Sequence, residues 1–484
     1  MSTTGSAGTT ASERYLNELC KRSFLSLWSY PNLFRDQGRK AHKGDGKELC
    51  DHLIVFNEHV IIFSDKSCAF PNSGNIELDW RRWYKRSIKQ SAEQIFGAER
   101  WLREHPDRIY VDRSCVKKIP IPIRQGSRFH RVVVALNAST RCKQYFGDAR
   151  SGSLAILSSL QAAARPFCIG DVDPERGFVH VLDDVTLDII LREVDTVSDF
   201  TNYLTRKEDL FRSKIVVAAG EQDILAHYLT HTNNQHRHDF VVGERFDGVS
   251  FPERAWAKVA TNPQYLAKKD ADKPSYAWDE LIEKLNSHVL GGTLAQGNER
   301  PLTDHEQGLR QLASESRFSR RSLVRALFDL MATTPEGGNK MRMVLSEQER
   351  ERAYILLIAG QDPWHPEYRE RRSGLLAAYC QVAKVYRPKL RDIIGIATEP
   401  VDFDSRSEDL IYLNARQWRA EDQRSAELLQ RKFGFLKRLT RTPFHDDEFP
   451  NQGGPRQQEE SESRRASNRG KRRMQMKSRR NKWR

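Results

Sequence analysis

Residues 48–66 read ELCDHLIVFNEHVIIFSDK, and this stretch decides the expected fold of the first part of the chain. Two runs of β-branched and aromatic residues, LIVF at 53–56 and VIIF at 60–63, have the length and composition of buried strands. The three residues between them, Asn-Glu-His, suit a tight turn. The stretch therefore predicts a buried β-hairpin.

Charged residues flank both predicted strands. Asp51 enters the first strand, and Ser-Asp-Lys follows the second, ending at Lys66. Alternate residues of a strand share a face, so Ser64 and Lys66 are expected on one side and Asp65 on the other unless the strand ends there. A helical turn from Glu48 to Asp51 would make these two carboxylates close neighbours. Converging carboxylates repel unless a cation lies between them, and Mg²⁺ binds through a few carboxylates together with water and phosphate.

The hairpin resembles the PD-(D/E)XK nuclease superfamily, in which an acid opens one strand and an acid-x-lysine motif closes the next. The resemblance covers residues 20–105 and assigns the first acid to Asp51, the lysine to Lys66 and a supporting acid to Glu48. The middle position departs from the pattern because it holds Ser64. Either the strand breaks and Asp65 turns inward, or the second acid has moved; the candidates for such a moved acid are Glu77, Asp79 and Glu93.

The resemblance implies an α+β restriction-endonuclease-like core and a metal-dependent nuclease. It makes Glu48, Asp51, Asp65 and Lys66 the catalytic residues. The three acids are expected to hold Mg²⁺ or Mn²⁺, and the lysine to assist the attacking water. The expected substrate is DNA in preference to RNA. The expected biological role is defence against foreign DNA. The alternatives are an inactive nucleic-acid-binding or scaffold protein that retains the fold, and solvated charges that merely flank a hairpin.

A long amphipathic helix is predicted over residues 79–104. Its apolar stripe consists of Trp80, Tyr84, Ile88, Ser91, Ile95, Ala98 and Leu102. Gln94 borders this stripe, where nucleases of the resembled class can carry an accessory glutamine. Arg81 and Arg82 begin a basic outer face that either contacts a phosphate backbone or is simply solvated, and Lys47 precedes the hairpin in a basic loop.

The net charge of +14 comes mainly from the last residues. Residues 464–484 contain eleven Lys or Arg and no acid, which leaves 14 − 11, or about +3, for the rest. This composition predicts a disordered tail over 446–484 in which Lys471, Arg472 and Arg473 bind nucleic acid.

The seven cysteines never form a CxxC pair, and we find neither a secretory signal nor a run that could span a bilayer, so a cytoplasmic protein with free thiols is expected.

The sequence as a whole predicts a disordered start (1–12), a nuclease-like domain (13–200) and a mainly helical domain (201–445). Short strands are expected near 108–111, 117–123, 129–136, 153–157 and 178–183, and helices near 279–290, 305–313, 319–332, 346–360 and 374–386, with a strand at 391–397. Residues 227–238 contain four histidines, which suggest a zinc enzyme as a third hypothesis. The segment HYLTH lacks the glutamate that serves as general base in the HExxH motif of metalloproteases. The oligomeric state is left open, and a homo-oligomer is compatible with the sequence.

Overall fold

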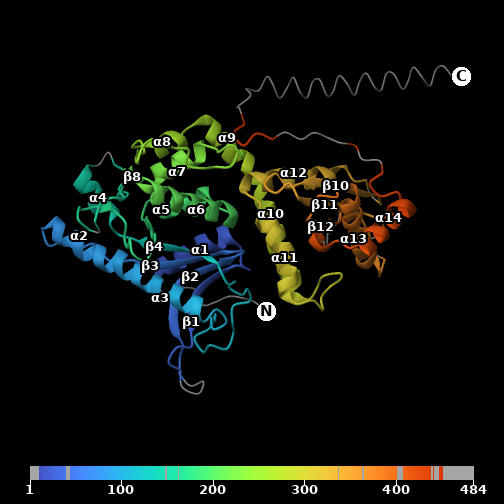
Figure 1. Ribbon diagram of the computed structural model, residues 1–484, viewed down its shortest axis with the longest axis horizontal. Helices are drawn as coiled ribbons and strands as arrows, with labels where there is room; N and C mark the ends of the chain where they lie inside the picture. The colour runs from blue at the N-terminus through green and yellow to red at the C-terminus, as the bar shows by residue number, and fades with distance from the viewer. Residues whose placement is uncertain are drawn as a thin grey trace.

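A computed structural model describes residues 10–39, 44–147, 150–161, 163–335, 337–361, 365–400, 407–437, 440 and 446–450. The chain is a mixture of helices and strands arranged around three sheets. Figure 1 shows the first sheet and its helices on one side, the last sheet on the other, and helices α10 and α11 between them. The expected α+β class is confirmed at this level.

The first sheet has the strand order β1-β2-β3-β4-β7. β1 to β3 form an antiparallel meander, while β3, β4 and β7 run parallel to one another. The bounds are β1 Ser29–Arg35, β2 Lys47–Phe56, β3 His59–Lys66, β4 Arg128–Ala135 and β7 His180–Asp183. The predicted hairpin is therefore confirmed as β2 and β3, and Asn57 takes the left-handed backbone conformation (φ 55°) that the tight turn requires.

Helices cover both faces of this sheet. On one face lie α1 (Ala11–Phe24), α5 (Thr186–Glu193) and α6 (Val197–Ser213), where the ring of Phe63 contacts those of Phe24 and Phe200. On the other face α3 packs against β2, β3 and β4. The alternation of side chains along β2 and β3 therefore sends successive residues toward two different sets of helices.

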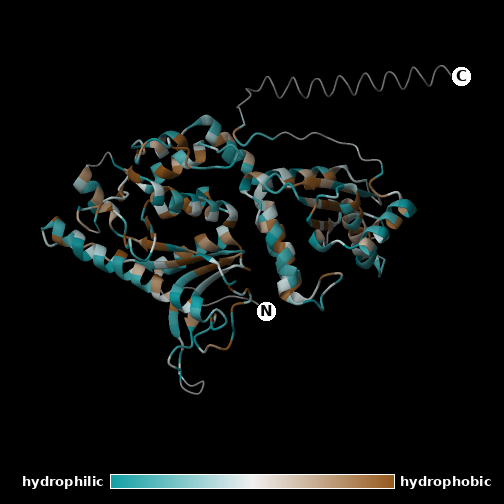
Figure 2. Cartoon of the chain, viewed as in Figure 1, coloured by the Kyte–Doolittle hydropathy of each residue, from teal (hydrophilic) through white to brown (hydrophobic). Residues whose placement is uncertain are grey.

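The helix on the second face is continuous from α2 (Ile76–Tyr84) through the π-helical turn η1 (Lys85–Lys89) to α3 (Gln90–Glu104). All seven residues of the predicted apolar stripe are buried, which confirms that prediction. The π turn inserts one extra residue per turn and was not expected from the sequence. Figure 2 shows hydrophilic residues along the outer side of this helix.

A small sheet with the order β6-β5-β8-β9 and several helices follow the first sheet. Their bounds are α4 Ser139–Phe146, β5 Ala155–Leu157, β6 Cys168–Ile169, β8 Ile215–Ala218, α7 Glu221–Thr230, β9 Gly248–Ser250, α8 Ala255–Ala260, α9 Pro263–Asp272 and η2 Lys273–Ser275. The segments 108–111 and 117–123, expected as strands, form only isolated bridges, at Tyr110 and Lys118. The expected domain boundary at residue 200 lies inside α6.

The second half contains a four-stranded sheet, whereas the sequence predicted mainly helices and a single strand at 391–397, which is confirmed as β12. The order is β10-β11-β12-β13, and β11 runs parallel to β12. The bounds are α10 Tyr276–Gly291, α11 Leu302–Ala313, α12 Arg317–Thr333, β10 Asn339–Leu345, β11 Arg352–Ala359, α13 Tyr368–Tyr386, β12 Asp392–Thr398, β13 Asp409–Asn414, η3 Ala415–Gln417 and α14 Ala420–Phe433. The helix predicted over 346–360 is wrong, because the buried run AYILLIA forms β11, and periodicity does not distinguish a buried strand from a buried helix.

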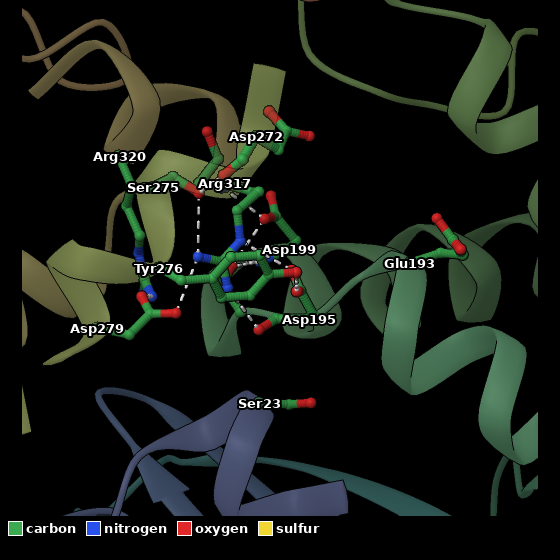
Figure 3. Close-up of polar contacts among 12 residues, drawn as sticks. Ser23, Glu193, Asp195, Asp199, Asp272, Ser275, Tyr276, Asp279, Arg317 and Arg320 are labelled. Atoms are coloured by element: carbon green, nitrogen blue, oxygen red, sulfur yellow. Dashed lines mark hydrogen bonds and ion pairs between the residues drawn. The ribbon is translucent and has the colours of Figure 1, made fainter. Parts of the chain in front are cut away.

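Buried arginines join the two halves of the chain (Figure 3). Arg317, at the start of α12, donates to Asp195 Oδ1 at 2.9 Å and to Asp279 Oδ2 at 2.8 Å. Its backbone N–H donates to Asp199 Oδ2 at 2.8 Å. Arg320 also bonds Asp279 and is only 1% exposed. Because all these charges are removed from water, each one depends on its partners.

We predict that Arg317→Ala lowers the free energy of unfolding by about 3–5 kcal/mol, because it leaves buried carboxylates without a counter-charge. Arg342→Ala, which removes an arginine from the exposed pair with Asp329, is the control and should cost less than about 1 kcal/mol. Urea unfolding followed by circular dichroism measures both values. Equal costs for the two variants would contradict the structural role of Arg317.

Candidate functional site

The two strands of the predicted hairpin separate at their polar end. β2 and β3 are paired from Phe56 and His59 as far as His52 and Phe63, whereas β3 stays paired with β4 up to Lys66. Beyond the last pair, the Asp51 side chain takes the place of a backbone acceptor. Its Oδ2 accepts a hydrogen bond from the backbone N–H of Asp65 at 2.5 Å. We call this end of the sheet, where β2 and β3 are no longer paired and Asp51 lies, the fork.

A bulge in β2 brings Glu48 toward Asp51. The register with β1 shifts so that Leu33 pairs with Cys50 but Phe34 pairs with Glu48, which leaves Leu49 as an extra residue. An extra residue reverses the alternation of side chains, so Glu48 and Asp51 share a face. The expected helical turn at this point is wrong, because these residues belong to β2, but the two carboxylates are still neighbours.

Three further polar side chains belong to the same face. Ser64 is the cross-strand neighbour of Asp51 by extension of the β2–β3 register, and its Oγ donates to Gln94 Oε1 of α3 at 3.3 Å. Lys66 lies two residues further along β3, is half-buried, and its charge lowers the pKa of Asp51. The structure therefore brings together Glu48, Asp51 and Lys66, as well as the bordering glutamine.

The Asp65 carboxylate does not join them. Strand alternation sends it to the face covered by α1, where Ser12 and Glu13 are the neighbours that affect its pKa. Burial is the main cause that raises the pKa of Asp65, whereas the Ser12 side chain and Lys66 act in the opposite direction. The expectation that Asp65 turns inward is thus not met, because β3 remains regular through Lys66 in its pairing with β4.

The three candidates for a moved acid are also engaged elsewhere or exposed. Asp79 accepts hydrogen bonds from the N–H and the hydroxyl of Ser73. Glu93 pairs with Arg176, and Glu77 is exposed on α2. The face at the fork therefore carries two carboxylates, and Ser64 occupies the position of the second acid.

Glu48 affects the Asp51 carboxyl group at the fork. Burial is the main cause that raises the pKa of Asp51 to about 7, and the neighbouring Glu48 contributes to this rise. The Asp65 N–H and Lys66 act in the opposite direction. Asp51 is only 6% exposed whereas Glu48 is exposed, so the site is reached from solvent on the Glu48 side. A divalent cation placed between two neighbouring carboxyl groups would stabilise their ionised forms.

The predicted nucleic-acid-binding residues fall into two groups. Lys47, Arg81 and Arg82 are exposed, the first at the start of β2 and the other two on α2. Lys471, Arg472 and Arg473 lie outside the described residues.

A second polar group lies in the same sheet, and the sequence did not reveal it. His130 of β4, His180 of β7 and Glu208 of α6 are buried, and their potential ligand atoms lie within 4.8 Å of one another, so the group could hold a metal ion. His130 pairs in register with Ile61, five residues before Lys66, which is roughly 16 Å along the strand. This group is therefore separate from the fork. The only sequence signal is a histidine inside each of two apolar strands.

The histidines at 227–238 do not converge. The rings of His227 and His231 stack at 3.8 Å, and His231 Nδ1 contacts the backbone oxygen of His227. His238 bonds Glu448, and His236 is exposed. These histidines contact a neighbouring ring, a backbone oxygen and a carboxylate. The arrangement gives no support to the hypothesis of a zinc enzyme.

No family model, curated protein or solved structure matches this chain. Within the part of the chain that the structure describes, the helices are too short or too polar to cross a bilayer.

We predict that Asp51→Asn stabilises the metal-free protein at alkaline pH. The folded-state pKa of Asp51, about 7, exceeds the ordinary value of about 3.9, so its contribution to stability is complete below pH 4 and is lost as the pH rises through 7. The variant is neutral throughout, so we expect it to be more stable than the wild type at pH 8 in EDTA by about 1–2 kcal/mol. Urea unfolding at pH 4 to 8 tests this, with exposed Glu77→Gln as control. A variant less stable than the wild type at pH 8 would contradict the assignment.

Proposed function

We propose that the chain is a divalent-metal-dependent nuclease that hydrolyses phosphodiester bonds, with DNA as its substrate. One observation carries this proposal: Glu48, Asp51 and Lys66 meet on one face at the open fork between β2 and β3. The strand order, a meander followed by a helix and a parallel strand, supports the resemblance to the PD-(D/E)XK class.

Asp51 and Glu48 would hold Mg²⁺ or Mn²⁺. The chemistry of the donors fits, because carboxylate oxygens are hard ligands and Mg²⁺ needs only one or two of them when phosphate and water supply the rest. Burial is the main cause of the raised pKa of Asp51, so a bound cation would favour the ionised form of this carboxyl. When bound, such an ion polarises a phosphoryl oxygen and lowers the pKa of a coordinated water.

Lys66 is suited to act on the phosphate or on the attacking water. Its ammonium group can stabilise the negative charge that develops on the phosphate, or orient the water by hydrogen bonding. Ser64 and Gln94, joined at 3.3 Å, provide neutral polar atoms on the same face, which can position water without competing for a cation as a carboxylate would.

The exposed side of α2 and η1 would contact the phosphate backbone. Five cations gather there without an ion pair to any described residue: Arg81, Arg82, Lys85, Arg86 and Lys89. Residues four apart on a helix are about 6 Å apart along its axis, so these charges form a continuous ridge. The ridge leads into α3, which carries Gln94 at the fork.

A nucleic-acid-binding protein without catalysis is the second candidate. The observation in its favour is that Ser64 replaces the second acid while the carboxylate of Asp65 faces α1. In that case the fork would retain its polar residues, and the basic ridge would account for the function.

A plasmid-nicking assay with Mg²⁺ or Mn²⁺ separates the two candidates. We expect Asp51→Ala and Lys66→Ala each to reduce the rate at least about 100-fold, because each removes a charge that acts at the reacting phosphate. Glu77→Gln, on the exposed side of α2, is the matched control and should cut like the wild type. Cleavage that survives both alanine substitutions would exclude this site, and wild-type binding without cleavage would favour the second candidate.

We predict that replacing Arg81, Lys85 and Lys89 by Gln weakens DNA binding in a salt-dependent manner. Loss of three phosphate contacts should reduce the slope of log Kd against log salt by about 2.7, because each contact releases about 0.9 counterion. The control replaces three cations of α14, Arg424, Arg431 and Lys432, and should leave the slope unchanged. Fluorescence anisotropy at several salt concentrations measures both, and equal slopes in the two variants would contradict the ridge.

A further inference from the structure

The buried group His130, His180 and Glu208 joins three elements of the first domain. Glu208 Oε1 lies 2.6 Å from His130 Nδ1 and 3.2 Å from His180 Nε2. The three residues come from β4, β7 and α6, and all are less than 9% exposed. A ligand shared by them would tie α6 to the two parallel strands.

The donor atoms select a class of metal. Two imidazole nitrogens and one carboxylate oxygen are a ligand set of Zn²⁺ and related transition metals. Mg²⁺ prefers oxygen ligands and retains several waters, which a site buried on all sides does not provide. The group at the fork, with two carboxylates and solvent access, therefore differs from this group in both chemistry and exposure.

Outer contacts hold the ligands in a suitable orientation. His130 Nε2 lies 2.9 Å from His59 Nδ1, so the nitrogen of His130 that faces away from Glu208 has a hydrogen-bond partner. Glu208 Oε2 accepts from Arg128 Nη2 at 2.6 Å, which fixes the carboxylate. Arg128 also pairs with Asp209 at 3.4 Å, so its charge remains balanced when Glu208 binds a cation.

The two ligand distances that involve Glu208 require a small adjustment, and all three ligand atoms lie within 4.8 Å of one another. With bonds of about 2.0–2.1 Å, the ligand atoms of a tetrahedral ion lie about 3.4 Å apart. The separation between His180 and Glu208 is close to this value, whereas Glu208 must withdraw from His130 by less than about 1 Å. We propose that His130, His180 and Glu208 bind one Zn²⁺-class ion that stabilises the packing of α6 on the first sheet.

Metal analysis of untagged, full-length protein tests this assignment. After dialysis we expect about one zinc ion per chain in the wild type, and less than about a tenth of that in His130→Gln and Glu208→Gln. His52→Gln is the matched control, because His52 is equally buried in the same sheet but contacts Ser29 outside the group. Asp51→Ala should retain zinc, which separates this site from the fork whatever the nicking assay finds.

A measurement on the wild type covers the case in which the variants do not fold. Removal of zinc by a strong chelator should lower the thermal midpoint, and added Zn²⁺ should restore it, because a ligand that binds only the folded state stabilises it. Substitution by Co²⁺ should give the visible absorption of a site with nitrogen and oxygen ligands. The proposal would be overturned if the wild type purifies with less than about a tenth of an equivalent of zinc and its thermal midpoint does not respond to the chelator or to added Zn²⁺. The three residues would then form a network of hydrogen bonds without a metal.

Discussion

A carboxylate takes the place of a backbone carbonyl where β2 and β3 separate, and the arrangement of the candidate site depends on this substitution. The Asp65 N–H would lose its ladder partner at the fork, and an unpaired buried amide costs about 1–3 kcal/mol. Asp51 supplies the missing acceptor at 2.5 Å. The same contact holds the Asp51 carboxylate at the fork. One hydrogen bond therefore satisfies the backbone and positions a buried carboxyl group that is costly to ionise.

Much of the first domain could be predicted from local patterns. The hairpin, the apolar stripe of the long helix and the strand around His130 follow from residue composition and periodicity, which depend on near neighbours in the chain. The strand β11 could not be assigned in this way, because a short, fully apolar run has no period that separates strand from helix. In the same sheet, the strand predicted over 391–397 is confirmed as β12, whereas the half-exposed strands β10 and β13 were not predicted.

The candidate site was predictable only in part, and for a different reason. Glu48, Asp51 and Lys66 are close in sequence to the fork, so their convergence followed from the hairpin, although the bulge at Leu49 and not a helical turn brings Glu48 into place. The face that Asp65 adopts depends on the pairing of β3 with β4, where its partner Val134 lies 69 residues later in the chain. His130, His180 and Glu208 are likewise separated by long intervals, and no spacing rule relates them.

The buried arginines between the two halves affect how this chain can change during evolution. Asp195 and Asp199 belong to the first half, while Arg317, which neutralises the first and bonds the second through its backbone, belongs to the other. A recombination event that exchanged the second half for an unrelated module would leave these anions without compensation. The two halves are therefore expected to be inherited together, and a functional variant should arise by substitution within them and not by module exchange.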